Sequence, residues 1–83
     1  MWYVYFLELS NRDIYVGYTR DLRQRFKTHN DGLVHATKGF LPAKLKSYVS
    51  VDHRSVALNL EKYFKSGSGK AFAFKRFLDK PKS

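Results

Sequence analysis

Hydrophobic side chains along residues 2–18 follow the pattern of two paired strands. Residues 2–9 are rich in aromatic and β-branched side chains, which favour a strand, and residues 14–18 have the same character. The intervening segment 10–13, Ser-Asn-Arg-Asp, has the composition of a turn. We therefore predict a β-hairpin over residues 2–18.

The length of the hairpin loop decides whether Tyr5 and Tyr15 lie on the same face of the hairpin. A loop with an odd number of residues, or a bulge, puts both side chains on one face. A two-residue turn at Asn11 and Arg12 puts them on opposite faces. The sequence alone leaves both registers open.

A helix is predicted over residues 21–30. Leu22 and Phe26 are four residues apart and form its core-facing side, and Thr19 or Asp21 can cap its start. Gly32 follows the helix and suits a left-handed backbone at its end. Residues 33–43 then form a basic loop.

The second half of the chain predicts one further strand and two helices. The strand covers residues 44–51, with Leu45 in the core and with Tyr48, Val49 and Val51 as further candidates. The next helix covers residues 54–65 and is capped by Asp52 or Ser55. The residues expected to form its apolar stripe are Val56, Leu60, Tyr63 and Phe64.

Residues 66–69, Ser-Gly-Ser-Gly, are predicted to break that helix, and a short helix over 70–78 follows, with Phe74, Phe77 and Leu78 facing inward. The order β-β-α-β-α-α predicts an α+β fold, in which a small, three-stranded, mostly antiparallel sheet is flanked by about three helices. We expect residues 1–83 to form one domain.

Composition excludes several classes of protein. No apolar run reaches the roughly 20 residues of a membrane helix, and the apolar start lacks the basic region and cleavage site of a signal peptide. We therefore expect no membrane partner. The sequence has no cysteine, which excludes disulfides, thiolate catalysis and cysteine-based zinc sites, and which fits a cytoplasmic protein.

The balance of charge points to an anionic partner. Sixteen lysines and arginines oppose seven acidic residues, which gives a formal net charge of +9. The basic residues are spread from Arg12 to Lys82, so they cover a folded surface, as in nucleic-acid-binding domains. The alternative is a basic protein without an acidic partner.

Five side-chain positions are candidates for chemistry. Arg25 and His29 are four residues apart and share one helix face, although a solvated basic face is the alternative. Glu61 lies at the edge of an apolar stripe, where a carboxylate needs a metal or a salt bridge to a neighbouring lysine or arginine. The strand tyrosines Tyr5 and Tyr15 are either functional or part of the core.

Together these residues resemble the GIY-YIG nuclease superfamily, in particular its short, single-domain bacterial members. Similar catalytic domains stand at the N-terminus of excision-repair nucleases and homing endonucleases. The matching segments follow in order and cover nearly the whole chain: Tyr3-Val4-Tyr5, Tyr15-Val16-Gly17, residues 19–32 with Arg25 and His29, Thr37-Lys38 followed by Pro42, residues 57–62 with Glu61, and residues 65–72.

The resemblance implies a role for each of five catalytic residues. Tyr5 would act as general base or proton relay for the attacking water, and Tyr15 would orient the scissile phosphate or assist the proton transfer. Arg25 would bind the phosphate. His29 would accept a hydrogen bond or a proton from a tyrosine, and Glu61 would hold one Mg²⁺ or Mn²⁺ ion. Arg25 and the metal are expected to lower the pKa of Tyr5.

The chain also departs from the family pattern. Tyr3 stands where the family has the glycine of its first tripeptide, and the asparagine downstream of the glutamate has no clear counterpart, for which Ser66 or Ser68 could substitute. We expect His35 and His53 to be ordinary surface residues. The residues expected to contact nucleic acid are Gly17, Arg20, Lys38, Lys44 and Lys46.

These patterns predict a metal-dependent endonuclease that hydrolyses DNA phosphodiester bonds, with RNA as a further possible substrate, in DNA repair or structure-selective processing. The alternative is a non-catalytic nucleic-acid-binding module with the same fold. All five catalytic positions are intact, which favours the nuclease.

Overall fold

The structure is a computed structural model that describes residues 1–78 of the chain. Within these residues the order is β-β-α-β-α-α, which confirms the α+β prediction. The elements are β1 (Trp2–Glu8), β2 (Ile14–Thr19), α1 (Leu22–Asn30), β3 (Lys44–Val51), α2 (Arg54–Lys65), α3 (Gly67–Ala73) and a π-helical turn, η1 (Phe74–Leu78).

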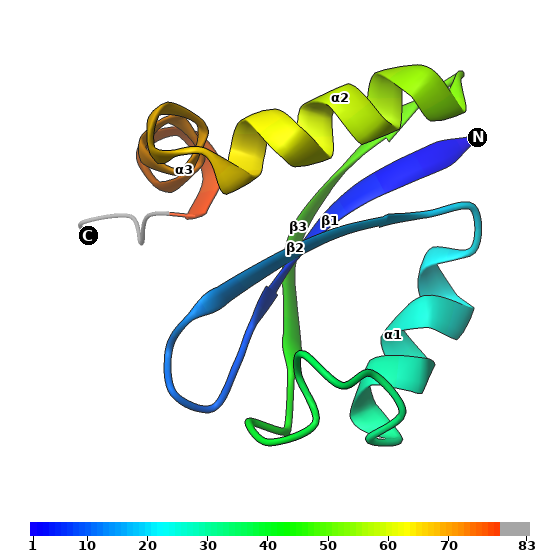
Figure 1. The fold of residues 1–83 in the computed structure, drawn as a ribbon, viewed down its shortest axis with the longest axis vertical. Coiled ribbons are helices and arrows are strands. Elements are labelled where there is room, and N and C mark those ends of the chain that lie inside the picture. Colours follow the sequence, from blue (N-terminus) through cyan, green and yellow to red (C-terminus); the bar gives the residue numbers. More distant parts are fainter. Residues whose placement is uncertain (79–83) are drawn as a thin grey trace.

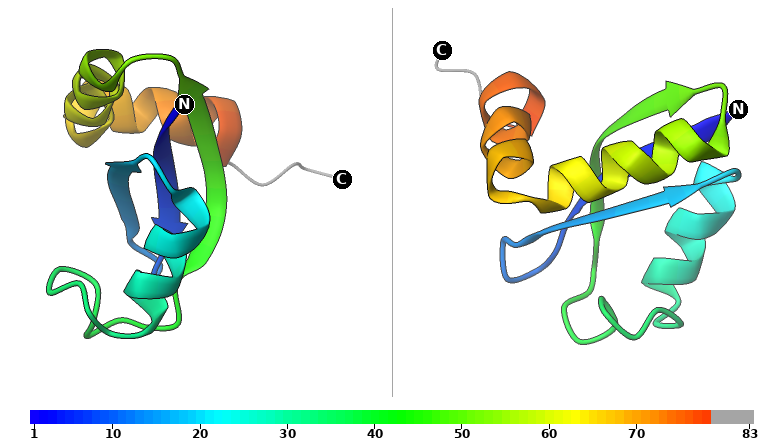
Figure 2. Two further views of the ribbon diagram at one scale, coloured as in Figure 1. Left: turned by 90° about the vertical axis from the view of Figure 1, so that its right-hand side faces the viewer. Right: turned by 45° about the horizontal axis from the view of Figure 1, so that its top comes forward.

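The three strands form one antiparallel sheet in the order β2-β1-β3, so that β1 is central. Helix α1 covers one face, and α2 and α3 cover the other (Figures 1 and 2). Side chains of β1 alternate between the two faces. Val4 and Phe6 pack under α2, whereas Tyr5 and Leu7 pack under α1, and all four side chains are buried.

The hairpin loop settles the register of the two tyrosines. Glu8 pairs with Ile14, so five residues separate the strands, and Arg12 takes a positive φ of 75° within this turn. Tyr5 pairs with Gly17, and Leu7 pairs with Tyr15. Directly paired residues share a face, and so do residues two apart on one strand. Tyr5 and Tyr15 therefore lie on the same face, the one under α1.

Helix α1 forms as its sequence predicts. The side chain of Asp21 caps it by accepting a hydrogen bond from the Gln24 N–H at 3.0 Å. Leu22 and Phe26 pack toward the sheet. Gly32 follows with a φ of 78°, a conformation that glycine adopts without steric cost.

The predicted core contacts of β3 are partly wrong. Leu45 is 39% exposed and Tyr48 is 51% exposed, whereas Val49 and Val51 are half-buried. The reason is that β3 is an edge strand and that α1 packs over β1 and β2. The α1-facing side of β3 is therefore open to solvent.

The predictions for α2 need two corrections. The residue that caps α2 is His53, which makes no side-chain cap hydrogen bond, so neither Asp52 nor Ser55 has that role. The buried side of α2 consists of Ala57 and Phe64 with Leu60 beside them. The side chains of Val56 and Tyr63, which were expected in the core, are exposed because the helix is rotated about its axis relative to the prediction.

The break between α2 and α3 is shorter than predicted. It consists of Ser66 alone, which ends α2 and caps α3 by accepting a hydrogen bond from the Gly69 N–H. Helix α3 therefore begins at Gly67 and not at residue 70. Phe74 is 46% exposed, contrary to prediction, whereas Leu78 is buried and Phe77 packs against the core. Among residues 1–78, no helix is long and apolar enough to span a membrane.

Candidate active site

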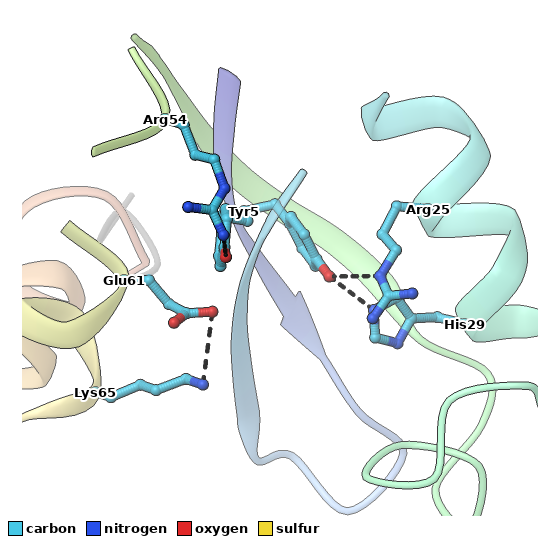
Figure 3. Close-up of polar contacts among 7 residues, drawn as sticks. Tyr5, Arg25, His29, Arg54, Glu61 and Lys65 are labelled. Atoms are coloured by element: carbon cyan, nitrogen blue, oxygen red, sulfur yellow. Dashed lines mark hydrogen bonds and ion pairs between the residues drawn. The ribbon is translucent and has the colours of Figure 1, made fainter. Parts of the chain in front are cut away.

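A buried hydrogen-bond network joins β1 to α1. The hydroxyl of Tyr5 lies 2.8 Å from His29 Nε2, and Arg25 Nε donates to the same hydroxyl at 3.4 Å (Figure 3). Both Tyr5 and His29 are buried. Arg25 and His29 are one helical turn apart on α1, so their side chains point to the same place on the sheet.

The fourth member of this network is Thr37, in the loop before β3. Its hydroxyl lies 2.8 Å from His29 Nδ1 and 3.4 Å from the Val34 carbonyl oxygen. If the hydroxyl donates to that carbonyl, its oxygen accepts the Nδ1–H of His29. His29 Nε2 is then an acceptor, and Tyr5 donates its phenolic hydrogen to it.

Asn30 fixes the loop that carries Thr37. Its side-chain amide donates to the Ala43 carbonyl at 3.1 Å and accepts from the Ala43 N–H at 2.8 Å. This pair of bonds ties the end of the loop to α1. Thr37 and Asn30 were given no role from the sequence, because each acts on a residue brought close only by the fold.

Burial and charge set the protonation of these groups. Burial raises the pKa of Tyr5, and the nearby Arg25 only partly offsets it. Arg25 thus acts on the pKa of Tyr5 in the expected direction, but burial outweighs it and the pKa lies above its ordinary value. Burial, followed by the charge of Arg25, lowers the pKa of His29 to about 4. At neutral pH Tyr5 is a phenol and His29 is uncharged.

Tyr15 extends the network toward α2. Its ring centre is 5.1 Å from that of His29 and 6.4 Å from that of Tyr5. On the other side, Lys65 Nζ lies 5.9 Å from the centre of the Tyr15 ring. Tyr15 therefore stands between residues of α1 and residues of α2.

Glu61 approaches the site from α2. Its side chain is 15% exposed and forms an ion pair with Lys65, with 3.6 Å between Oε2 and Nζ. In Figure 3, Glu61 and Lys65 lie on one side of the pale blue strand, and Arg25 and His29 lie on the other. The charge of Glu61 is close enough to contribute to the raised pKa of Tyr5. The five predicted catalytic residues thus gather around β2, an edge strand.

Gly17 has a packing role that its sequence position did not reveal. It is buried, and a methyl group in its place would come 2.5 Å from Tyr5 Cζ. The ring of Tyr5 therefore lies directly against this glycine. The contact of Gly17 with nucleic acid stays a prediction.

The basic residues that were predicted to contact nucleic acid lie at three places around the molecule. Arg20 lines a cavity of about 540 Å³ together with Tyr3, Phe26 and Tyr48. Lys44 and Lys46 line a second cavity of about 360 Å³ at the start of β3. Lys38 is exposed in the loop next to Thr37. The contacts of these basic residues with nucleic acid stay predictions.

Two further predictions concern surface side chains. His35 and His53 are exposed, as expected. Ser66, one of two candidates for the role of the family asparagine, uses its hydroxyl to cap α3 and to contact the Tyr63 carbonyl. Ser68 is exposed.

The structure combines a three-stranded antiparallel sheet with two tyrosines on one face. A helix with an arginine and a histidine covers that face, and a helix with a glutamate lies on the other side of the edge strand. This combination defines a class of nuclease fold. The GIY-YIG catalytic domain matches residues 1–75, and the chain belongs to this family. Proteins with a catalytic domain of this family are generally endonucleases that use a divalent metal.

The similar proteins are bacterial and archaeal. The chain is 40% identical over 65 residues to the UPF0213 protein YsiG of Lactococcus lactis, covering 77% of this chain and 62% of that protein. It is 40% identical to the UPF0213 protein HQ_3675A of Haloquadratum walsbyi, covering 77% and 73% of the two chains. The chain thus spans somewhat less than two thirds of the Lactococcus proteins' length.

A solved structure supports the same fold. The solution structure of the UPF0213 protein BH0048 from Bacillus halodurans superposes with a TM-score of 0.57 at 30% sequence identity. The match covers 90% of this chain and 84% of that one.

Proposed function

We propose that this chain is a metal-dependent endonuclease that hydrolyses phosphodiester bonds in DNA. The observation that carries the proposal is the buried Tyr5–His29–Arg25 network, which opens toward Glu61 across the edge strand β2. A buried tyrosine that contacts both a buried histidine and a half-buried arginine is far more specific than a basic surface.

Arg25 is proposed to bind the scissile phosphate. It is half-buried and held by its contact with Tyr5, so little side-chain freedom is lost when it binds. Its guanidinium matches two phosphate oxygens and stabilises the negative charge that develops during cleavage.

Tyr5 and His29 are proposed to move the proton of the attacking water. The Tyr5 oxygen accepts that proton while its own hydrogen passes to His29 Nε2, 2.8 Å away. The charge of Arg25 disfavours an imidazolium here. A phosphate bound to Arg25 offsets that charge, so substrate binding raises the proton affinity of His29 when it is needed.

The residues present fit a magnesium ion held mainly by Glu61. Within residues 1–78, no group of three or more histidine, cysteine or acidic side chains is arranged to hold a metal. One carboxylate suffices for Mg²⁺, which keeps several waters and takes phosphate oxygens as ligands. When bound, the ion supplies charge stabilisation at the phosphate and a more acidic water. Lys65 would then give up its ion pair with Glu61.

The Glu61–Lys65 ion pair also supports the second candidate, a nucleic-acid-binding module without turnover. A glutamate at the edge of an apolar stripe is sufficiently explained by its lysine partner. The two candidates differ in whether Glu61 is needed for cleavage.

The chain's location in the cytoplasm is likewise a proposal, consistent with its lack of cysteine.

The test is cleavage of plasmid, single-stranded and branched DNA, and of an RNA strand, in Mg²⁺ or Mn²⁺. We expect Glu61→Ala and Arg25→Ala each to lower kcat by about 100- to 1,000-fold, the loss typical of removing one transition-state contact. The controls are Arg23→Ala, at an exposed position of α1 two residues before Arg25, and Asp52→Ala, at an exposed position just before α2.

Cleavage that survives both Glu61→Ala and Arg25→Ala unchanged contradicts the nuclease assignment. Salt-sensitive binding without cleavage of any substrate supports the binding module. Comparison of the DNA substrates shows whether cleavage is structure-selective.

A further inference from the structure

Two arginines flank the ring of Trp2 at one end of the sheet. The guanidinium carbon of Arg20 lies 5.5 Å from the ring centre, and that of Arg54 lies 6.0 Å from it. Arg54 also donates a hydrogen bond to the Tyr18 hydroxyl at 3.0 Å and lies over the Tyr18 ring at 5.7 Å. We call Trp2, Arg20 and Arg54 the arginine clamp.

The clamp concentrates positive charge without a carboxylate to neutralise it. Neither arginine forms an ion pair with an acidic residue among residues 1–78. Both are exposed, and each guanidinium carbon lies within 6.0 Å of the same ring centre. An anion bound beside this ring is therefore attracted by both charges.

The aromatic contacts also hold the guanidiniums in place before any ligand binds. The cation–π contacts with Trp2 and, for Arg54, the bond to Tyr18 restrict side chains that are otherwise mobile. A restricted arginine loses less entropy when it binds, and its planar fork matches phosphate oxygens. The clamp therefore has the charge and the rigidity of a phosphate site.

The clamp is next to the proposed active site. Arg54 precedes Glu61 by seven residues on α2, which is two helical turns, so the two side chains lie on one side of the helix. Figure 3 shows Arg54, Glu61 and Lys65 in a row beside the edge strand. The separation of Arg54 and Glu61 along the helix is about 10 Å, which corresponds to about two or three nucleotides of one strand.

We propose that the arginine clamp binds a second backbone phosphate of the substrate, two or three nucleotides from the phosphate held at Arg25 and Glu61. The proposal rests on the proposed function for the identity of the substrate. A nucleic-acid strand bound at both phosphates would run from the end of the sheet at Trp2 along α2 toward Lys65.

Trp2 is the single tryptophan of the sequence, so its fluorescence reports on the clamp directly. The experiment titrates an oligonucleotide into the full chain without divalent metal, so that binding is measured without cleavage. We expect the emission of Trp2 to change on binding. Arg54→Gln or Arg20→Gln should weaken binding about 5- to 10-fold and reduce the slope of log K against log salt by about 0.7–0.9.

Arg76→Gln is the matched control, because Arg76 is also exposed and also stacks on an aromatic ring, Phe72, at 5.8 Å. It removes the same charge far from the clamp along the chain, and we expect a smaller loss of affinity and an unchanged Trp2 response. Arg54→Lys, which keeps the charge but not the planar fork, should recover part of the affinity.

Equal losses of affinity and of salt dependence for Arg54→Gln and Arg76→Gln overturn the clamp. That result leaves the nuclease assignment intact if Glu61→Ala still lowers kcat as expected above. Conversely, a clamp-dependent Trp2 response in a chain that cleaves nothing supports the phosphate site and rejects the nuclease. Circular dichroism of each variant confirms that the change is in binding and not in folding.

Discussion

Individual side chains at the site are controlled by burial as much as by their partners. His29 is fully buried, with Tyr5 on one ring nitrogen and Thr37 on the other. Both contacts suit a neutral imidazole, and burial with the charge of Arg25 lowers its pKa to about 4. The protonation of one residue is thereby coupled to the folding of the whole chain.

This coupling predicts a pH dependence of stability. The pKa of His29 falls from 6.5 to about 4 on folding, so its contribution is fully present above pH 6.5 and is lost as the pH falls toward 4, where the unfolded chain gains the proton first. We expect the free energy of unfolding to decline through this window, by at most about 1.4 kcal/mol per pH unit from this residue.

The measurement is urea denaturation at pH 7 and pH 5. His29→Gln should be less stable at pH 7, but it should lose much of the decline between the two values. The exposed His35→Gln should behave like the unchanged protein. A decline in His29→Gln as steep as that of the unchanged protein would falsify the assignment to His29.

At the scale of elements, the sharp junction between α2 and α3 holds the C-terminal end of α2 beside the edge strand. Ser66 alone separates the helices, and it both contacts the Tyr63 carbonyl and caps α3. A methyl group on Gly69 would overlap the backbone carbonyl of Tyr63. The glycine is therefore needed for close packing of the two helices, next to the turn of α2 that carries Lys65.

Gly69→Ala should destabilise the protein by about 1–3 kcal/mol, because the added methyl group forces backbone apart in a packed junction. Gly67→Ala is the matched change, with no atom within 4 Å of the added methyl group. It should be neutral or stabilising by about 0.4–1 kcal/mol, because alanine restricts the unfolded chain. Urea denaturation compares the two, and equal effects would refute the packing argument.

At the scale of the whole molecule, one strand serves two hydrophobic clusters. Phe6 of β1 packs against Phe64 and Phe77 at ring-centre distances of 5.0 and 5.3 Å, whereas Tyr5, its neighbour, packs under α1. Tyr5, the proposed catalytic tyrosine, is thus part of the second cluster. Loss of packing on either face of β1 is expected to disturb the site.

Phe6→Ala should cost about 3–5 kcal/mol, the range for removing a fully buried phenylalanine. That is a large share of the stability of a small domain. The same substitution at Phe40, which is 44% exposed, is the control and should cost little. Thermal and urea unfolding followed by circular dichroism measure both, and a mild effect at Phe6 would show that the core is more adaptable than its packing suggests.

The sequence by itself determined the elements and the identities of the catalytic candidates. Periodicity and turn residues specify the two hairpin strands and α1, because these depend on neighbours within a few residues. The sequence left the α1 cap open between Thr19 and Asp21, and the structure has Asp21 there. The motif spacing likewise identified Arg25 and His29, which one helical turn brings together. Such local relations can be predicted from the sequence alone.

Only the tertiary structure decided which elements cover which strand. It left Leu45 exposed on an edge strand, supported His29 with Thr37 from the loop after α1 and raised the pKa of Tyr5 by burial. Each outcome depends on how the elements and loops pack in space, which the local pattern does not give. An apolar pattern predicts that one face of an element is buried. It does not say which other element covers that face, or whether any element covers it.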